Sequence, residues 1–365
     1  MRHVQALLDR LAIDVPIIQA PMAGASTPEL VAAVANAGGL GSHGCAMLTP
    51  EQVSEDAARV LALTNRSFNL GFFCHEAPHV TPAQEQAWRD RLAPYYQELG
   101  LDPASPPGPL RMPFDARMCE VVEAIRPRVV SFHFGMPPAN LVDRVKAAGC
   151  LVMSSATTVA EARRLADLGC DAVVAQGFEA GGHRGMFLTN AVDSQVGTFA
   201  LVPQMVDAID LPVIAAGGIT DARGVAAALV LGAAAVQVGT AYLFCPEAKI
   251  SPLHRAALKN ARDDETTLTN VFTGRPARGL INRLVREMGP MSDIAPQFPV
   301  TANSVQPLRT AAEQKGSADF TALWAGQAAA LGREAGAAEL TRQLAADAFA
   351  QLRALAGGLD LTARN

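Results

Sequence analysis

The feature that most constrains the fold is an alternation of short apolar runs with alanine-rich segments. Eight runs have the length and composition of buried strands, at residues 16–22, 40–45, 67–73, 128–135, 150–156, 171–177, 212–218 and 234–243. Helical patterns, such as 138–148, 158–168, 198–209 and 221–231, lie between them and are long enough for crossovers between parallel strands. Eight such units favour a closed (β/α)8 barrel, a TIM barrel of the α/β class, over an open doubly wound sheet.

Two stretches depart from this alternation. Residues 74–114 are polar and rich in proline, and a connection of this length predicts an inserted loop or lid. After residue 243 the strand pattern ends, and a mostly helical extension is predicted. Its helical patterns lie at 256–262, 323–334 and 339–355, with a proline-containing stretch at 290–307. We therefore expect a barrel over residues 1–245 and a helical cap over residues 246–365.

Composition narrows the class of protein. The net charge is −5 and no basic run occurs, so nucleic acid is not a predicted partner. The six cysteines stand singly, without the spacing of a zinc site or of a disulfide scaffold, and no metal is predicted. No targeting segment or membrane-spanning apolar run is evident, which predicts a cytoplasmic enzyme acting on small molecules away from membranes. The oligomeric state is left open.

The loop after the sixth predicted strand is the strongest candidate for chemistry. Residues 176–185 read Q-G-F-E-A-G-G-H-R-G, which places His183 among four glycines. Glycines let a backbone approach a ligand closely, and a histidine exchanges protons near neutrality. The alternative is a surface turn with a solvated histidine. The position at a strand's carboxyl end favours the first interpretation, because barrel enzymes carry their active sites there.

Further candidates fall at the ends of other predicted strands. Gly217 and Gly218 follow the seventh strand, and Gly239 and Thr240 lie in the eighth. Glycine N–H groups between these two strands commonly bind a phosphate in barrel enzymes. Asp221 is better explained as the N-cap of the next helix than as a catalytic acid.

Several collinear motifs resemble the nitronate monooxygenase family, formerly called 2-nitropropane dioxygenases. They are Q-A-P-M-A-G-A-S-T-P-E-L (19–30), A-N-A-G-G-L-G-S (35–42), S-F-H-F-G (131–135), the loop at 176–185 and V-I-A-A-G-G-I-T-D-A-R-G (213–224). The resemblance spans about residues 12–245, and E-A-G-G-H-R-G is similar to the class I group. It implies a TIM-barrel flavoprotein that binds FMN without a metal. Its reaction would convert an alkyl nitronate, with propionate 3-nitronate the first candidate, and O2 into a carbonyl compound and nitrite.

The resemblance also implies roles for individual residues. FMN would contact Ala20, Met22, Asn69, Gln176, Gly181, Gly217, Gly218, Gln237, Val238, Gly239 and Thr240. Asn69 and Gln176 can both donate and accept, which suits the polar edge of a flavin, although ordinary loop contacts would also satisfy them. His183 matches the active-site histidine. We expect it to orient and stabilise the nitronate, and to act as a base only towards a neutral nitroalkane.

Two points stay open at this stage. His133 is a second candidate for substrate binding, and its alternative is a structural histidine bonded to a neighbouring carbonyl. Residues 295–307 correspond to a segment that approaches the active site in class I relatives and there carries tyrosines and a lysine. Here the segment reads A-P-Q-F-P-V-T-A-N-S-V-Q-P, so the partner of a substrate carboxylate is not identified.

Three other functions compete with this interpretation. An FMN-dependent enoyl-ACP reductase shares the A-P-M and E-A-G-G-H motifs, although the H-R-G ending and the longer tail favour the nitronate enzyme. An NADH:quinone reductase is the second alternative. The third is a non-catalytic barrel that binds a phosphorylated metabolite.

Overall fold

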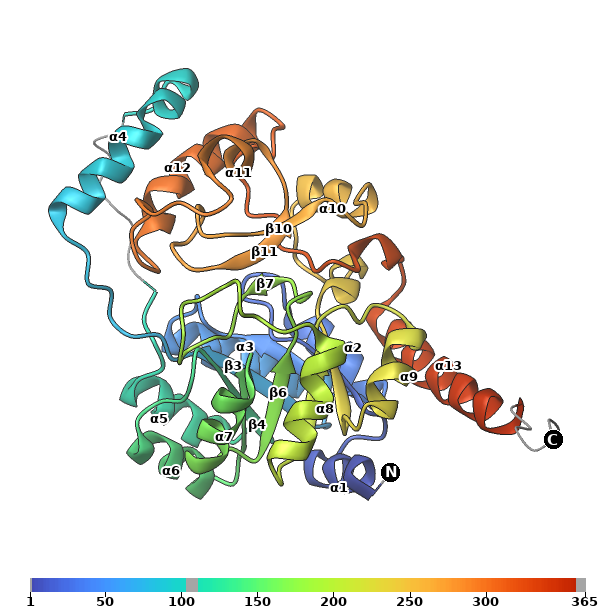
Figure 1. The fold of residues 1–365 in the computed structure, drawn as a ribbon. Coiled ribbons are helices and arrows are strands. Elements are labelled where there is room, and N and C mark those ends of the chain that lie inside the picture. The colour runs from blue at the N-terminus through green and yellow to red at the C-terminus, as the bar shows by residue number, and fades with distance from the viewer. Residues whose placement is uncertain (1, 103–110, 359–365) are drawn as a thin grey trace.

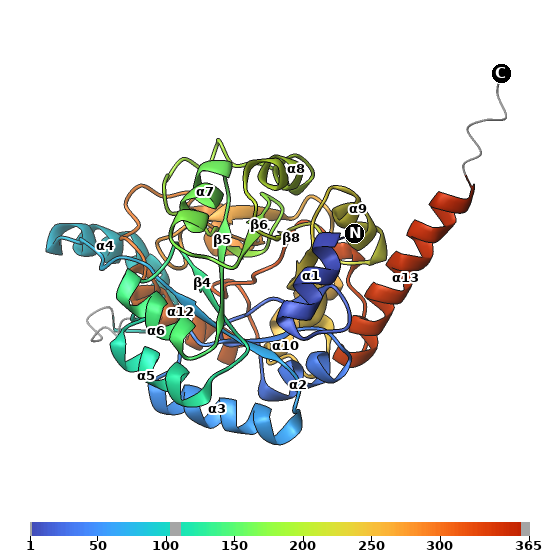
Figure 2. The same cartoon turned by 90° about the horizontal axis from the view of Figure 1, so that it is seen from below.

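The computed structural model describes residues 2–102 and 111–358, and its centre is a ring of eight parallel strands (Figures 1 and 2). The strands are β1 (Ile17–Gln19), β2 (Gly41–Gly44), β3 (Phe68–Phe73), β4 (Val129–His133), β5 (Leu151–Ala156), β6 (Ala172–Gln176), β8 (Val213–Ala216) and β9 (Ala235–Val238). They pair in the order β1-β9-β8-β6-β5-β4-β3-β2, and a bridge between Ile18 and Leu40 brings the two end strands together. The predicted TIM barrel is confirmed.

The eighth predicted strand is too long. β9 ends at Val238, and Thr240–Phe244 form a short 3-10 helix, η1. Gly239 separates the two elements, with a helical φ of −110° and ψ of −72°. The apolar run continues because the η1 side chains are buried as fully as those of a strand, so hydrophobicity alone does not reveal the change.

Helices cover the outside of the ring, and several begin where the sequence indicates. They are α2 (Pro28–Asn36), α3 (Pro50–Leu63), α5 (Ala116–Ile125), α6 (Ala139–Ala147), α7 (Val159–Asp167), α8 (Thr198–Ala208) and α9 (Ala222–Val230). The Thr27 hydroxyl accepts a hydrogen bond from the backbone N–H of Leu30 at 3.0 Å, which caps α2. Asp221 caps α9 by accepting from the N–H groups of Arg223 and Gly224, so its predicted structural role is confirmed.

Helix α1 (Arg2–Leu11) closes the N-terminal end of the barrel (Figure 2). Its residues Leu7 and Leu11 pack against side chains that fill the interior, among them Ile18, Met153 and Ile214. Because this end is packed solid, a ligand cavity must lie at the opposite end, where the strands finish.

The insertion at residues 74–114 contains a helix that was not predicted, α4 (Pro82–Leu99). A capping box between Thr81 and Gln84 starts it, and Gly100 ends it in the left-handed region with a φ of 71°. The helix lies against α12 (Thr301–Gln314) from the C-terminal part of the chain (Figure 1). Residues 103–110 of the insertion lie outside the described residues.

Insertion and C-terminal part share one hydrophobic core. Trp88 and Leu92 of α4 pack in the same cluster as Leu308 of α12 and Phe320. A polar helix with a narrow apolar face is difficult to recognise in a proline-rich stretch, because its packing partners lie more than two hundred residues away.

The expectation that strands end after residue 243 was wrong. β10 (Thr266–Thr269) and β11 (Ala277–Leu280) form an antiparallel pair, and β11 also pairs with the two-residue strand β7 (Gly182–His183). These strands have at most four residues and include threonine, arginine and glycine, so they lack the apolar alternation on which the prediction relied.

The C-terminal helices are predicted with mixed success. The structure contains α10 (Pro252–Lys259), α11 (Arg283–Met288), α12 and α13 (Ala337–Gly358), and Pro307 lies inside α12. The helix expected at 323–334 is absent except for one 3-10 turn, η2 (Ala329–Leu331). Trp324 instead forms a β-bridge with Gly279, so tertiary pairing overrides the local helical preference. The division of the chain near residue 245 stays a prediction.

Replacing Gly41 with alanine is expected to destabilise the barrel. An added Cβ would lie 2.1 Å from the carbonyl oxygen of Val31, where β2 meets α2, and backbone has to move to relieve the overlap. We expect the free energy of unfolding in denaturant to fall by roughly 1–3 kcal/mol. Gly357→Ala is the matched control, because a Cβ there meets nothing within 4 Å. Equal denaturation midpoints for the two variants would contradict this account.

Candidate active site

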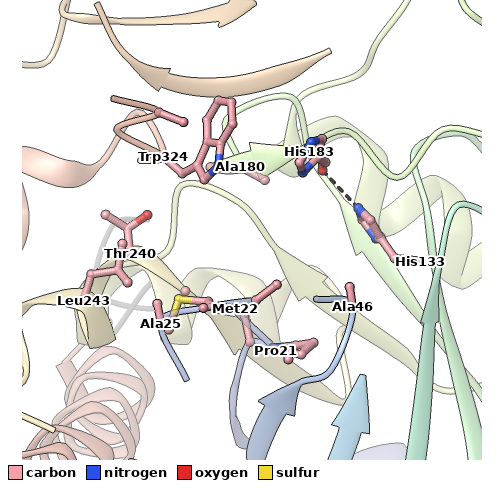
Figure 3. Close-up of a pocket in the computed structure, with 18 of the residues that line it drawn as sticks. Pro21, Met22, Ala25, Ala46, His133, Ala180, His183, Thr240, Leu243 and Trp324 are labelled. Atoms are coloured by element: carbon pink, nitrogen blue, oxygen red, sulfur yellow. Dashed lines mark hydrogen bonds between the residues drawn. The ribbon is translucent and has the colours of Figure 1, made fainter. Parts of the chain in front are cut away.

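A cavity of about 500 Å³ lies at the carboxyl ends of the barrel strands (Figure 3). Met22, Pro21 and Ala46 of the barrel face it from one side, and His183 and Trp324 face it from the other. Its size is that of a site for a cofactor or a substrate. Of the predicted site residues, the cavity wall includes Ala20, Met22, His133, Gln176, Gly181, His183, Gly217, Gly218, Gln237, Gly239 and Thr240.

Two predicted residues, Asn69 and Val238, are not on this wall. The Val238 side chain points outward and packs in the core behind β9, because side chains alternate along a strand and Gln237 and Gly239 face inward. Asn69 is fully buried in β3, where its Nδ2 donates to Ser131 Oγ at 2.8 Å. Asn69 Oδ1 has no hydrogen-bond partner among the described residues, while Ser131 lines the cavity.

The loop at 176–185 is held by its own side chains. Gln176 donates from Nε2 to the carbonyl oxygen of His183 at 2.9 Å and accepts at Oε1 from the Gly185 N–H at 2.7 Å. Arg184 is fully buried and donates to the carbonyl oxygens of Gly177 at 2.6 Å and of Gln176 at 2.9 Å. Both ends of the Gln176 amide are therefore engaged in positioning the loop.

The sequence did not indicate a role for Arg184, which is one residue of the glycine-rich loop at 176–185. Burial lowers its pKa to about 10, so the guanidinium stays charged at neutral pH. Its contacts with carbonyl oxygens replace the hydration that burial removes.

The imidazole of His183 is enclosed by aromatic rings and remains neutral near pH 7. Phe298 and Trp324 lie at centroid distances of 5.4 and 5.5 Å from it. Burial lowers the pKa of His183 well below its ordinary value, and the positive charge of Arg111 lowers it further. Its Nε2 is 3.0 Å from Thr273 Oγ1, a contact supplied by the C-terminal part of the chain that no sequence pattern indicated.

His133 uses both of its ring nitrogens inside the protein. Nε2 lies 3.1 Å from the carbonyl oxygen of His183, the contact drawn in Figure 3, and Nδ1 lies 3.0 Å from Ser155 Oγ. A carbonyl only accepts, so Nε2 carries the proton and Nδ1 accepts from the serine hydroxyl. Burial lowers the pKa of His133 to about 4. This geometry corresponds to the structural alternative for His133, although the ring also lines the cavity.

Glycines line another part of the cavity wall. Gly217 and Gly218, at the end of β8, have φ values of 114° and 70°, in the region that side chains rarely adopt. A Cβ on Gly217 would lie 2.9 Å from Thr198 Oγ1 and 3.1 Å from the Ala180 N. Nearby, the Thr240 hydroxyl accepts from the N–H of Gly326 at 3.0 Å. Backbone can approach a ligand closely here, as a phosphate group requires.

Segment 295–307 reaches the cavity without the tyrosines and the lysine. Phe298 packs on His183, and Ala302, Val305 and Gln306 line the wall. The cavity lining includes the cationic side chains of Arg111, Lys249 and Arg309, none of which the sequence singled out.

No group of three or more histidine, cysteine, aspartate and glutamate side chains within residues 2–102 and 111–358 is arranged to hold a metal ion. Burial raises the pKa values of the Cys45 and Cys74 thiols, so neither is an activated nucleophile.

The family model for nitronate monooxygenases matches residues 5–347. The chain belongs to the nitronate monooxygenase family. It is 46% identical to a nitronate monooxygenase of Pseudomonas aeruginosa over 337 residues, which cover 92% of this chain and 96% of that one. It is 44% identical to a nitronate monooxygenase of Paraburkholderia phytofirmans over 343 residues, covering 93% and 94%. The resemblance seen in the motifs is confirmed, and the chain is an oxidoreductase.

Solved structures agree with this placement. The nitroalkane oxidase of Streptomyces ansochromogenes superposes with a TM-score of 0.87 at 38% identity, covering 96% of this chain and 99% of that one. FabK of Thermotoga maritima is more distant, with a TM-score of 0.74 at 27% identity and coverage of 97% and 99%. Nitronate monooxygenase family membership implies dependence on a flavin. None of the described helices is long and apolar enough to cross a membrane.

The pKa of His133 predicts a loss of stability in acid. In the unfolded chain this histidine takes up a proton near its ordinary pKa of 6.5, whereas in the folded protein it does so only near 4. Its contribution to stability is therefore complete above about pH 6.5 and is lost as the pH falls towards 4. Urea unfolding across this pH range measures the free energy of unfolding. For His133→Gln this free energy should fall less steeply with decreasing pH than for wild type, by up to about 1.4 kcal/mol per pH unit. His79→Gln, at an exposed position, is the control for the loss of a histidine side chain. Parallel curves for wild type and His133→Gln would refute the assignment.

Proposed function

We propose that the protein is an FMN-dependent nitronate monooxygenase that converts an alkyl nitronate and O2 into a carbonyl compound and nitrite, with propionate 3-nitronate as the first candidate substrate. The observation that carries the proposal is the neutral imidazole of His183 on the wall of a glycine-lined cavity, in a chain of this family. Small molecules are the partners that a cavity of this size fits.

The residues on the wall are chemically suited to FMN. Gly217, Gly218 and Gly239 offer backbone N–H groups near Thr240 for a phosphate. Ser131 lines the cavity and accepts from Asn69 Nδ2 at 2.8 Å, and its hydroxyl can pair with a polar ring edge. When bound, the flavin supplies the acceptance of electrons from the nitronate and their transfer to oxygen.

The hydroxyl of Thr273 can pair with either neutral tautomer of His183. This hydroxyl lies 3.0 Å from His183 Nε2 and 3.3 Å from the carbonyl oxygen of Arg275, and it has one proton for the two acceptors. When it donates to Nε2, Nδ1 keeps a proton that can be donated to a nitronate oxygen. When it donates to Arg275, Nε2 carries the proton and Nδ1 is free to accept one from a neutral nitroalkane. The Thr273 hydroxyl therefore accommodates either neutral tautomer, and the tautomer determines whether Nδ1 acts as a donor or as a base.

Positive charge near His183 favours an anionic substrate. Arg111 and Arg275 both act electrostatically on the imidazole and oppose its protonation. The same field lowers the energy of a nitronate in the cavity, so binding relies on fixed guanidinium groups while His183 stays neutral.

A spectrum of the purified protein, followed by anaerobic mixing with propionate 3-nitronate, tests the proposal. We expect absorption bands between about 350 and 450 nm from bound FMN, and a loss of the longer-wavelength band on mixing. A colourless protein would favour the metabolite-binding alternative. Oxidation of NADH without a reaction with nitronates would favour one of the two reductase alternatives and would overturn the proposal.

His183→Asn is expected to lower kcat/KM for the nitronate by roughly 10²-fold or more, because asparagine cannot exchange a proton. The content of bound FMN, measured from its absorbance after denaturation, should stay near one per chain. His79→Asn, at an exposed position, serves as the control and should behave as wild type. Unchanged kinetics in His183→Asn would exclude His183 from the reaction.

A further inference from the structure

Arg111 presents a guanidinium group to the cavity from the end of the insertion. The backbone is anchored at Arg111 itself and at Phe114, three residues later. Its carbonyl oxygen accepts from His75 Nε2 at 3.1 Å, and the N–H of Phe114 donates to the carbonyl oxygen of Phe73, at the end of β3, at 2.8 Å. The segment that returns from the insertion to the barrel therefore places Arg111 on the cavity wall.

This guanidinium has no anionic partner in the described part of the chain. No ion pair or side-chain hydrogen bond of Arg111 is formed with residues 2–102 or 111–358, and its nearest aromatic contact is Phe298, 5.9 Å from Cζ to the ring centroid. Burial and the nearby charge of Arg309 both lower the pKa of Arg111. A partly desolvated cation beside another cation is costly unless an anion joins it.

Two neighbouring arginine side chains, Arg309 and Arg275, already have partners within the protein. Arg309 reaches the same wall from α12, but its Nε donates to Glu313 at 2.9 Å. Arg275 stacks on Phe134 at 3.9 Å and donates to the carbonyl oxygen of Met186. Lys249 also lines the cavity, but it is exposed to solvent. Of the cations on the described wall, Arg111 is thus the partly buried one that is left available for a ligand.

Phe298 lies close to both Arg111 and His183. Its ring centroid lies 5.4 Å from that of His183 and 5.9 Å from the Arg111 guanidinium carbon. A short molecule whose nitronate group lies at His183 can therefore extend across Phe298 and bring its other end to Arg111. The segment that carries Phe298 offers neutral side chains here, such as Ala302 and Gln306.

We propose that Arg111 binds a carboxylate at the far end of the substrate and so makes the enzyme selective for short nitronates that carry a second negative charge. This inference rests on the proposed function and adds the residue that determines specificity. A guanidinium suits the task because it donates two parallel hydrogen bonds to one carboxylate.

The test compares two nitronates with the same carbon chain, propionate 3-nitronate and propyl-1-nitronate, in the FMN-loaded enzyme. Arg111→Met should lower kcat/KM for propionate 3-nitronate by about 10- to 100-fold, mainly through KM. It should lower kcat/KM for propyl-1-nitronate by only a few-fold, because this substrate loses the electrostatic field of the guanidinium but has no carboxylate for it to bind. Arg111→Lys should recover part of the loss. Arg117→Met, an exposed arginine on α5, is the control and should leave both substrates unaffected.

Equal losses on both substrates, or no loss on either, would overturn the role of Arg111. If the wild-type enzyme oxidises both nitronates with the same kcat/KM, the role of Arg111 is also overturned, while the proposed function stays intact. If neither nitronate is oxidised, the proposed function fails, and binding of 3-nitropropionate, followed by tryptophan fluorescence, decides the subsite separately. Binding at least about 10-fold weaker in Arg111→Met than in wild type supports it, and equal affinity refutes it.

Discussion

The pairing of Gly182 and His183 with Ala277 and Arg278 joins the barrel to the rest of the chain, and the site depends on it. Two residues of the glycine-rich loop become a strand of a second sheet, which fixes the backbone that carries the imidazole. Gln176 and His133 then bind the carbonyl oxygen of His183 from the barrel side. Neither half of the molecule orients His183 alone, because the barrel holds its backbone and the C-terminal part contacts its ring.

The electrostatics of the cavity follow from this arrangement. The histidines that line it are kept neutral by burial, whereas Arg184 and Arg275 stay charged in similar surroundings because their pKa values remain near 10. Positive charge is therefore permanent across the physiological range and does not depend on the protonation of a histidine. Such a cavity attracts anions without requiring an acidic medium.

The barrel could be predicted from the sequence because its strands and helices repeat a pattern set by local burial. The elements that were not predicted correctly depend on contacts between residues far apart in the sequence. Helix α4 is stabilised by a core formed with α12, and β11 by its pairing with β7, so neither has a clear local pattern. The region 323–334 looked helical from its alanines, yet the bridge between Trp324 and Gly279 holds it extended. The residues around His183 were predicted from position and family resemblance. Thr273 contacts His183, and Arg111 reaches the cavity, only through tertiary structure.

The core shared by α4 and α12 has a consequence for recombination between relatives. Trp88 and Leu92, from the first third of the chain, are covered by Leu308 and Phe320 from its last part. In a chimaera that exchanges only the C-terminal segment, these side chains pack against residues from another parent, whose shape does not complement them. The insertion and the C-terminal part therefore form one structural unit from two separate segments of sequence. A chimaera that folds has to take both segments from the same parent.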